Sequence, residues 1–240
     1  MKIEELAYHK TPLGELVLRR REEPRLQNIE VFEVKLGDEF LMSSLFVEAE
    51  EQLSKIGLAG LSGELDVVVG GLGLGYTAAA ALDFENVKTV LVIDLFREVI
   101  DWHEAGIVPL GSRLSGDKRC EMRQGDFFEL AKTGFDISDK TRKFDAVLLD
   151  IDHSPEHFLD AKNESFYGIE GLKSLRKQLK DKGVFALWSN DPPDEKFRRQ
   201  LESIFGEASA ETIEFANPYT QGSSVNSVYV ARSGMNLPSE

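Results

Sequence analysis

Four aspartates follow short apolar runs of this chain, at positions where carboxylates could bind a ligand or move a proton. Asp94 ends the run Leu-Val-Ile, and Asp126 stands in the segment Gln-Gly-Asp-Phe. Asp150 and Asp152 follow the run Ala-Val-Leu-Leu. If these runs are parallel strands, their carboxyl ends meet at one edge of a sheet, where doubly wound folds bind ligands. We therefore expect one ligand site, although aspartate also caps helices and two of the four precede helical stretches.

A glycine cluster precedes the first of these aspartates and predicts a ligand-binding turn. Residues 65–75 read LDVVVGGLGLG, and an alanine-rich stretch follows. This order is typical of a buried strand, a tight turn and a helix start, where glycines allow close approach and free N–H groups face a ligand. Asp94 comes nineteen residues after Gly75, an offset at which an acid can bind ribose hydroxyls. The pattern predicts a nucleoside-containing cofactor, or else a glycine-rich turn without a ligand.

The glycine spacing narrows the choice of cofactor. Gly71, Gly73 and Gly75 form G-x-G-x-G, whereas the dinucleotide fingerprint requires glycine where Tyr76 stands. A nicotinamide oxidoreductase therefore fits less well, and no Gly-Lys-Ser/Thr follows to make a P-loop. The spacing resembles motif I of the class I S-adenosylmethionine-dependent transferases.

With such a nucleoside in the site, each acid can be given a role. Asp94 would bind ribose, and Asp126 would accept a hydrogen bond from the adenine amine, with Phe127 stacking or packing beside it. Asp150 and Asp152 would orient and deprotonate an incoming amine.

His153 is a further candidate for proton transfer. It stands in the segment Asp-His-Ser-Pro that follows the last apolar run. A histidine in a loop is more often a bystander than a catalyst, so both interpretations stay open.

Apolar strands and helical stretches alternate from residue 64 onward, which predicts an α/β fold with a doubly wound, mostly parallel, Rossmann-like sheet. The expected strands are 65–69, 90–93, 119–123, 146–149 and 184–188, and the expected helices are 76–82, 98–104, 127–132, 167–179 and 194–205. Two last strands, 211–215 and 227–231, are expected to form an antiparallel hairpin. This arrangement is that of class I methyltransferases.

The region before the glycine motif has a different pattern. Alternating segments such as IEVFEVKL predict β-hairpins, and apolar residues at helical spacing predict a helix over 46–56. We expect residues 1–60 to form a small N-terminal β-hairpin region plus a helix, ahead of a nucleoside-binding domain over 61–240.

Composition restricts the function classes. The 240 residues carry a net charge of −14, which disfavours nucleic-acid binding and favours a small cationic partner, although acidity also serves solubility. With one cysteine and four histidines we expect no disulfide and no metal site. Apolar runs are too short to cross a membrane, and the N-terminus does not resemble a signal peptide. These features together predict a cytoplasmic protein.

Several motifs together resemble the spermidine synthase family, the polyamine aminopropyltransferases, over residues 25–231. RLQNIEVFE at 25–33 resembles its Y-Q-x-I-x-V-F-E strand, VVVGGLGLG its V-V-x-G-G-G-D-G-G, and FDAVLLD its Y-D-x-I-I-x-D. The resemblance implies S-adenosylmethionine or its decarboxylated form as the donor, and a small, cationic amine as the aminopropyl acceptor. It places Gln27, Asp94 and Asp126 among the donor-binding residues and Asp150 on the catalytic aspartate. Because the family tends to dimerise, it also implies a homodimer.

Departures from the family pattern keep other functions open. Leu74 replaces the aspartate that contacts the donor's amino group and disfavours a carboxylate there, which would admit intact S-adenosylmethionine. The second acid of the D-x-x-D gate is displaced, with Asp152 one position early and His153 in its place. The family's Y-H-E segment has no counterpart at 48–57. An S-adenosylmethionine-dependent methyltransferase, and a non-catalytic binding protein with a relic pocket, therefore remain alternatives to an aminopropyltransferase.

Overall fold

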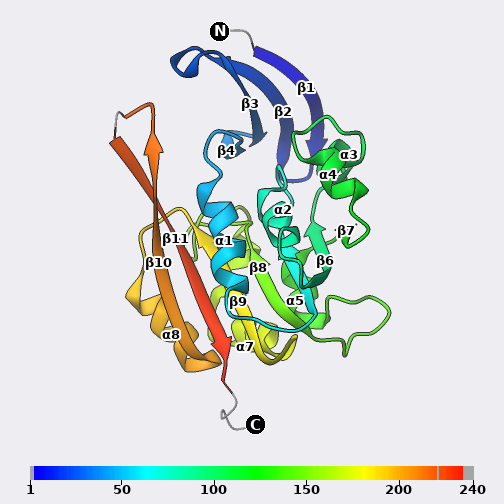
Figure 1. Ribbon diagram of the computed structural model, residues 1–240, viewed down its shortest axis with the longest axis vertical. Helices are drawn as coiled ribbons and strands as arrows, with labels where there is room; N and C mark the ends of the chain where they lie inside the picture. The colour runs from blue at the N-terminus through cyan, green and yellow to red at the C-terminus, as the bar shows by residue number, and fades with distance from the viewer. Residues whose placement is uncertain (1–2, 221, 235–240) are drawn as a thin grey trace.

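Two sheets organise the chain, which the computed structural model describes over residues 3–220 and 222–234. A four-stranded antiparallel sheet lies at one end of a seven-stranded sheet whose strand order is β10-β11-β9-β8-β5-β6-β7 (Figure 1). The smaller sheet comprises β1 (Ile3–Thr11), β2 (Gly14–Glu23), β3 (Ile29–Leu36) and β4 (Glu39–Ser43). Its alternating sequence buries Leu16 and Leu18 completely. This is the β-hairpin region expected at the N-terminus.

The larger sheet confirms the expected doubly wound α/β fold. Its strands are β5 (Leu65–Gly70), β6 (Val87–Asp94), β7 (Cys120–Gln124), β8 (Phe144–Leu149), β9 (Leu179–Ser189), β10 (Gly206–Asn217) and β11 (Gly222–Ser233). Strands β5 to β9 pair in parallel, and β11 pairs antiparallel with both β9 and β10. The C-terminal antiparallel hairpin is therefore also confirmed.

Helices cover both faces of this sheet, as its nearly continuous apolar strands require. The first face carries α1 (Glu48–Leu58), α2 (Tyr76–Leu82), α3 (Arg97–Glu104) and α4 (Gly111–Gly116), and the second carries α5 (Phe127–Thr133), α6 (Glu164–Tyr167), α7 (Ile169–Lys177) and α8 (Glu195–Phe205). Two short 3-10 helices, Pro24–Leu26 and Ala161–Asn163, complete the described elements. Helix α1 packs against α2 and β9, so we place it with the larger sheet.

The structure differs from the expected elements in two places. The helix expected over 167–179 is broken, because Gly168 adopts an extended conformation between α6 and α7. Its last residues instead begin β9, where Leu179 pairs with Phe144 of β8. Helix α4 was not predicted, because its sequence GSRLSG offers only Leu114 as a large apolar residue.

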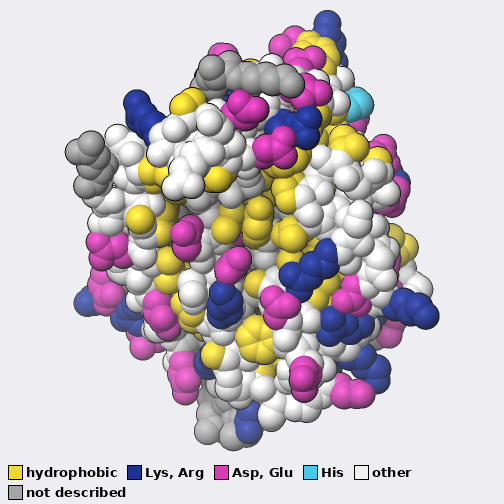
Figure 2. Space-filling view, turned by 45° about the horizontal axis from the view of Figure 1, so that its top comes forward, with side chains coloured by type: hydrophobic (Ala, Val, Ile, Leu, Met, Phe, Trp, Pro, Cys, Tyr) yellow, Lys and Arg dark blue, Asp and Glu magenta, His cyan; other side chains and the backbone are white. Residues whose placement is uncertain are grey.

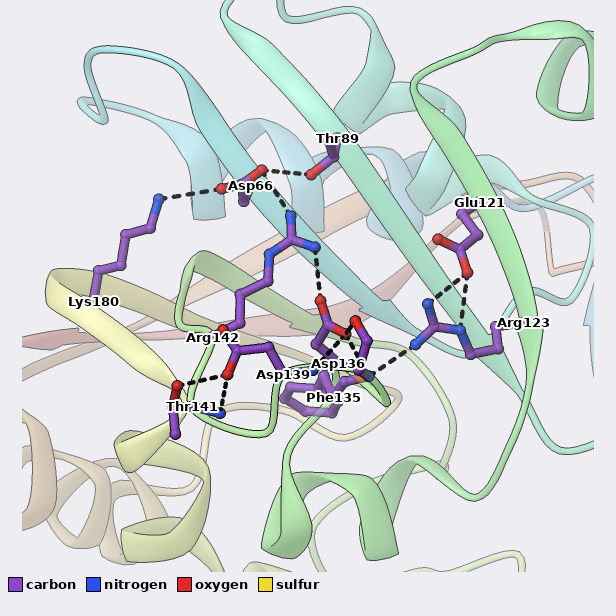
Figure 3. A network of polar contacts seen from close by, with 11 residues as sticks. Asp66, Thr89, Glu121, Arg123, Phe135, Asp136, Asp139, Thr141, Arg142 and Lys180 are labelled. Carbon is purple, nitrogen blue, oxygen red and sulfur yellow. Dashed lines mark hydrogen bonds and ion pairs between the residues drawn. The ribbon is translucent and has the colours of Figure 1, made fainter.

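A network of polar contacts lies at the amino ends of the parallel strands, opposite the edge that carries the candidate site (Figure 3). Asp66, near the start of β5, accepts a hydrogen bond from Thr89 Oγ1 at 2.6 Å. It also pairs with Arg142 at 3.2 Å and with Lys180 at 3.3 Å. These charges therefore have partners at the amino ends of the strands, away from the edge where ligands bind.

Acidic and basic side chains alternate over the surface in Figure 2, with hydrophobic side chains between them. On this face the acidic side chains form no single patch. Within the described residues, no helix is both long and apolar enough to cross a membrane. Nor do these residues hold a cluster of three or more metal-binding side chains.

Candidate active site

A pocket opens where the carboxyl ends of the parallel strands meet the N-terminal sheet. The N-terminal sheet and its turns contribute an apolar wall made of Leu13, Val34, Leu36, Leu41 and Met42. The larger sheet contributes most of the predicted site residues, namely Gly71, Gly73, Asp94, Asp126, Phe127, Asp150 and His153. Three predicted site residues, Gln27, Gly75 and Asp152, are not among the residues that line it. The structure thus brings most of the expected residues together in one pocket.

The glycine turn lies directly against the chain that leaves β8. Gly71 has a φ of +90°, and a Cβ there would lie 2.1 Å from the carbonyl oxygen of Asp150. The Asp150 N–H donates to the Gly70 carbonyl at 2.8 Å. Glycine is therefore required at position 71 by contact with the protein's own backbone. Gly75 precedes α2 and packs against the buried His103 instead of facing the pocket.

Asp94 fixes the glycine turn to the end of β6. Its Oδ2 accepts from the Leu72 N–H at 2.9 Å, and its Oδ1 accepts from the Phe96 N–H at 2.8 Å. Burial raises the pKa of Asp94, and the backbone N–H groups oppose that rise. Asp94 lines the pocket and also fixes the glycine turn through these two hydrogen bonds. A ribose bound there would share the Asp94 carboxylate with the Leu72 and Phe96 N–H groups.

Asp126 caps a helix and also lines the pocket. Its Oδ1 accepts from the Phe128 and Glu129 N–H groups at 2.9 and 3.2 Å, which caps α5. Its Oδ2 has no hydrogen-bond partner among the described residues, and Asp126 lines the pocket. The neighbouring Phe127 is only 2% exposed and packs edge-on against Phe128 and Phe166. Its ring therefore serves mainly the core.

Asp150 meets a second carboxylate that the sequence did not suggest. Glu50 of α1 lines the same pocket and is 9% exposed. The Thr77 hydroxyl lies 2.8 Å from Asp150 Oδ2 and 3.3 Å from the Glu50 carbonyl oxygen, which connects the two segments. Burial raises the pKa of Asp150 to about 6, opposed by the hydrogen bond from Thr77. Burial, followed by the charge of Asp150, raises the pKa of Glu50 to about 8.

Asp152 lies next to this pair in sequence but has a different environment. Its carboxylate is 1% exposed and accepts from the Leu159 N–H at 2.7 Å, from Asn163 Nδ2 at 2.9 Å and from the Tyr167 hydroxyl at 2.9 Å. Every oxygen is therefore occupied inside the protein. The structure gives Asp152 the position of a loop anchor instead of the proton-accepting position expected from the sequence.

The loop after β8 carries two histidines, His153 and His157, in different environments. His153 lines the pocket, with Nε2 3.5 Å from Glu39 Oε2 of the N-terminal sheet. His157 is exposed and contacts Ser154 and Asp191 outside the pocket. His153 thus stands where a proton or a polar group of a ligand could reach it.

Gln27 lies away from the other predicted residues. It is exposed at the end of the 3-10 helix between β2 and β3, with a φ of +58°. Because the β2–β3 turn lies outside the pocket, the structure does not bring Gln27 to the predicted donor site.

Sequence reasoning missed three residues that line the pocket, namely Glu50, Tyr76 and Trp188. A signal for Glu50 was present, because it lies three residues before Leu53 on the buried side of a predicted amphipathic helix. A carboxylate at a buried helical position is rare unless it has a partner or a function. Trp188 carried no comparable signal, since an aromatic residue ending an apolar strand resembles ordinary core.

The chain is similar to known proteins both in sequence and in fold. The family model described as "Spermine/spermidine synthase domain" matches residues 48–206. A spermidine synthase solved in complex with the transition-state analogue AdoDATO is 16% identical, with a TM-score of 0.74 over 97% of this chain and 74% of that one. The spermidine synthase from Thermotoga maritima is 17% identical, with a TM-score of 0.72 over 97% and 73%. At these identities the two structures establish the fold. No curated protein matches the chain.

Proposed function

Because this chain belongs to the spermine/spermidine synthase family, we propose that it transfers the aminopropyl group of decarboxylated S-adenosylmethionine to a small cationic amine. The observation that carries the proposal is that buried Glu50 and half-buried Asp150 line the same pocket as Asp94 and Asp126. Asp94 and Asp126 would bind the ribose and adenine of the donor. The carboxylate pair would then face the transfer centre.

The chemistry needs mainly positioning and one proton acceptor. Asp150 accepts a proton from the acceptor's ammonium group, and the freed amine attacks the carbon beside the donor's sulfonium. The new C–N bond forms as the C–S bond breaks, and the bonding electrons remain on sulfur. The products are the aminopropylated amine and neutral methylthioadenosine, with one proton left on the carboxylate. Asp150 suits this role because it is partly exposed to the pocket.

The charges of the pocket favour the decarboxylated donor over intact S-adenosylmethionine. Leu74, which replaces the family aspartate that disfavours a donor carboxylate, is fully buried and supplies no charge. Glu50, however, brings a carboxylate to the pocket from a different element. A donor carboxylate would approach like charges in a low-dielectric site, whereas the decarboxylated donor carries only positive charge.

Donor preference is the experiment that tests this function. Calorimetric titration with both donors should show that the decarboxylated form binds more tightly, and a transfer assay with diamines should yield methylthioadenosine. Tighter binding of the intact donor, with S-adenosylhomocysteine as the product, would support the methyltransferase alternative instead. Binding of neither nucleoside would favour the non-catalytic alternative.

Asp150→Asn should abolish transfer while leaving the affinity for methylthioadenosine within about threefold, because the amide cannot accept the proton. In the unmodified protein the rate should rise with pH through about 6, as Asp150 ionises.

Ionisation of Asp150 has the opposite effect on the stability of the fold. A pKa above the ordinary 3.8 means that stability falls as pH rises between these values, so Asp150→Asn should melt at a higher temperature at pH 7. A lower melting temperature together with lost binding would make Asp150 a structural residue.

A further inference from the structure

We propose that Glu50 is the second carboxylate of the amine site, and that Glu50 and Asp150 act as one unit that binds the acceptor's ammonium group and receives its proton. This inference rests on the proposed function for the identity of the reaction. It assigns to α1 a task that the sequence had placed entirely on the loop after β8. The family's D-x-x-D gate has its second acid at the position where this chain has His153. Glu50 would supply the carboxylate that is missing from that position.

The packing of α1 brings Glu50 to Asp150. A Cβ at Gly57 would lie 2.8 Å from Leu148 Cδ2 of β8 and 3.0 Å from the Ala186 Cβ of β9, so α1 rests directly on these strands. Glu50 lies two turns earlier on the same side of the helix. Asp150 lies two residues beyond Leu148, on the same side of its strand. The helix and the strand thus present both carboxylates to one end of the pocket.

The strand register adds an aromatic neighbour. Leu149 of β8 is aligned with Leu187 of β9, so Asp150 and Trp188 lie side by side at the sheet edge. Trp188 and Tyr76 both line the pocket with the two carboxylates. Carboxylates and aromatic rings that line one pocket form a favourable environment for an ammonium group.

Glu50 has no internal cation to neutralise it. No ion pair involves Glu50 among the described residues, and the charges that most raise its pKa are those of the acids Asp150, Glu48 and Glu51. Two neighbouring carboxylates in a pocket of low dielectric, without a counter-ion, hold at least part of a proton between them at neutral pH. An ammonium group entering the site supplies the missing positive charge, lowers the pKa of both acids and releases that proton. The site is therefore complete only when a cationic amine is bound.

Proton release on binding tests the inference independently of catalysis. Putrescine is titrated calorimetrically at pH 7 into the protein saturated with methylthioadenosine, in two buffers of different ionisation enthalpy. The unmodified protein should release about one proton per amine bound, because Glu50 ionises. Glu50→Gln should release far less. Absence of putrescine binding to the unmodified protein, or equal proton release by the variant, would overturn the proposal.

Kinetics give a second readout. Glu50→Gln should lower kcat/KM for the amine by about 100-fold. The unmodified protein's kcat/KM should keep rising from pH 6 toward pH 8, and the variant should lose the upper part of that rise, since Glu50 has a pKa of about 8. Unchanged kcat/KM with an unchanged pH profile would refute the role of Glu50 while leaving aminopropyl transfer intact. Conversely, Glu50-dependent proton release without transfer would refute the proposed function alone.

Matched variants separate this effect from damage to α1. Glu51→Gln changes the next residue, whose carboxylate pairs with Lys55 at 2.7 Å on the exposed side of the helix, and should change both readouts far less than Glu50→Gln does, because the charge of Glu51 acts on Glu50 only weakly. Glu50→Asp keeps the charge with a shorter side chain and should recover part of the proton release. If Glu50→Gln does not fold, proton release by Glu50→Asp that is reduced but still measurable would support the proposal, and release equal to that of the unmodified protein or absent altogether would overturn it.

Discussion

At the residue scale, the two donor-site aspartates differ in how much of each carboxylate remains for a ligand. Both oxygens of Asp94 already accept backbone N–H groups. Asp126 uses only Oδ1 for the cap of α5 and leaves Oδ2 without a partner in the described chain. Ribose binding by Asp94 and adenine binding by Asp126 remain predictions, and Asp126 allows the cleaner test.

Asp126→Ser should separate the cap from the adenine contact. Serine caps helices about as well as aspartate, so the free energy of unfolding should change by less than about 0.5 kcal/mol. Loss of Oδ2 removes a hydrogen bond to a charged acceptor and should weaken methylthioadenosine binding about tenfold. Thermal unfolding and calorimetric titration measure the two effects separately. Unchanged affinity would leave Asp126 with the cap as its only function.

At the element scale, one buried carboxylate anchors the loop between β8 and α6. Asp152 joins the start of this loop to Leu159, Asn163 and Tyr167. The anchored segment lines the pocket through Leu159, Asp160, Lys162 and Asn163. We therefore propose that Asp152 positions the wall of the acceptor site without itself touching the acceptor.

Asp152→Asn should loosen this loop, because the amide replaces one carboxylate oxygen by an NH₂ group. That group cannot accept the hydrogen bonds that Leu159, Asn163 and Tyr167 now donate to the carboxylate. Stability should fall by about 2 kcal/mol. If the loop forms the wall of the acceptor site, as we propose, the KM for the amine should rise about tenfold while the affinity for methylthioadenosine changes little. Tyr167→Phe removes one of the three contacts and should give a smaller effect of the same sign. A fall in kcat at unchanged KM would instead indicate direct participation in proton transfer.

At the scale of the whole molecule, the C-terminal hairpin holds the N-terminal sheet over the pocket. The Tyr219 hydroxyl, between β10 and β11, donates to Glu23 Oε2 at 2.6 Å and accepts from Arg21 Nη2 at 2.7 Å. Arg25 lies over the Tyr219 ring, 5.5 Å from its centroid. Figure 1 shows the tip of the hairpin reaching toward this sheet. Because the sheet supplies an apolar wall of the pocket, this contact links the ends of the chain to the site.

Tyr219→Phe should weaken that link by removing both hydrogen bonds. We expect the melting temperature to fall by about 2–4 °C. Amide exchange in β2 and β3 should accelerate, because the sheet loses a contact with the larger domain. Tyr8→Phe is the matched control, since the Tyr8 hydroxyl bonds Glu15 within the N-terminal sheet itself. Equal exchange rates in the two variants would show that the hairpin does not restrain the sheet.

The sequence alone determined the main architecture. The doubly wound sheet and the family could be predicted from the alternation of apolar strands and helices, the glycine turn and the closing pair of strands. Each of these signals is local in the sequence. The same local signals placed Asp94, Asp126 and Asp150 at one edge, since parallel strands end together. The homodimer, the cytoplasmic location and the division of the chain at residue 60 remain expectations from the sequence.

Tertiary structure alone decided which carboxylates face the pocket. Asp150 and Asp152 are two residues apart, yet one lines the pocket and the other is buried in an anchor. Glu50 is a hundred positions from Asp150 and becomes its neighbour only through the packing of α1 on β8 and β9. The geometry of such long-range contacts depends on close packing between elements, which no local pattern of residues encodes.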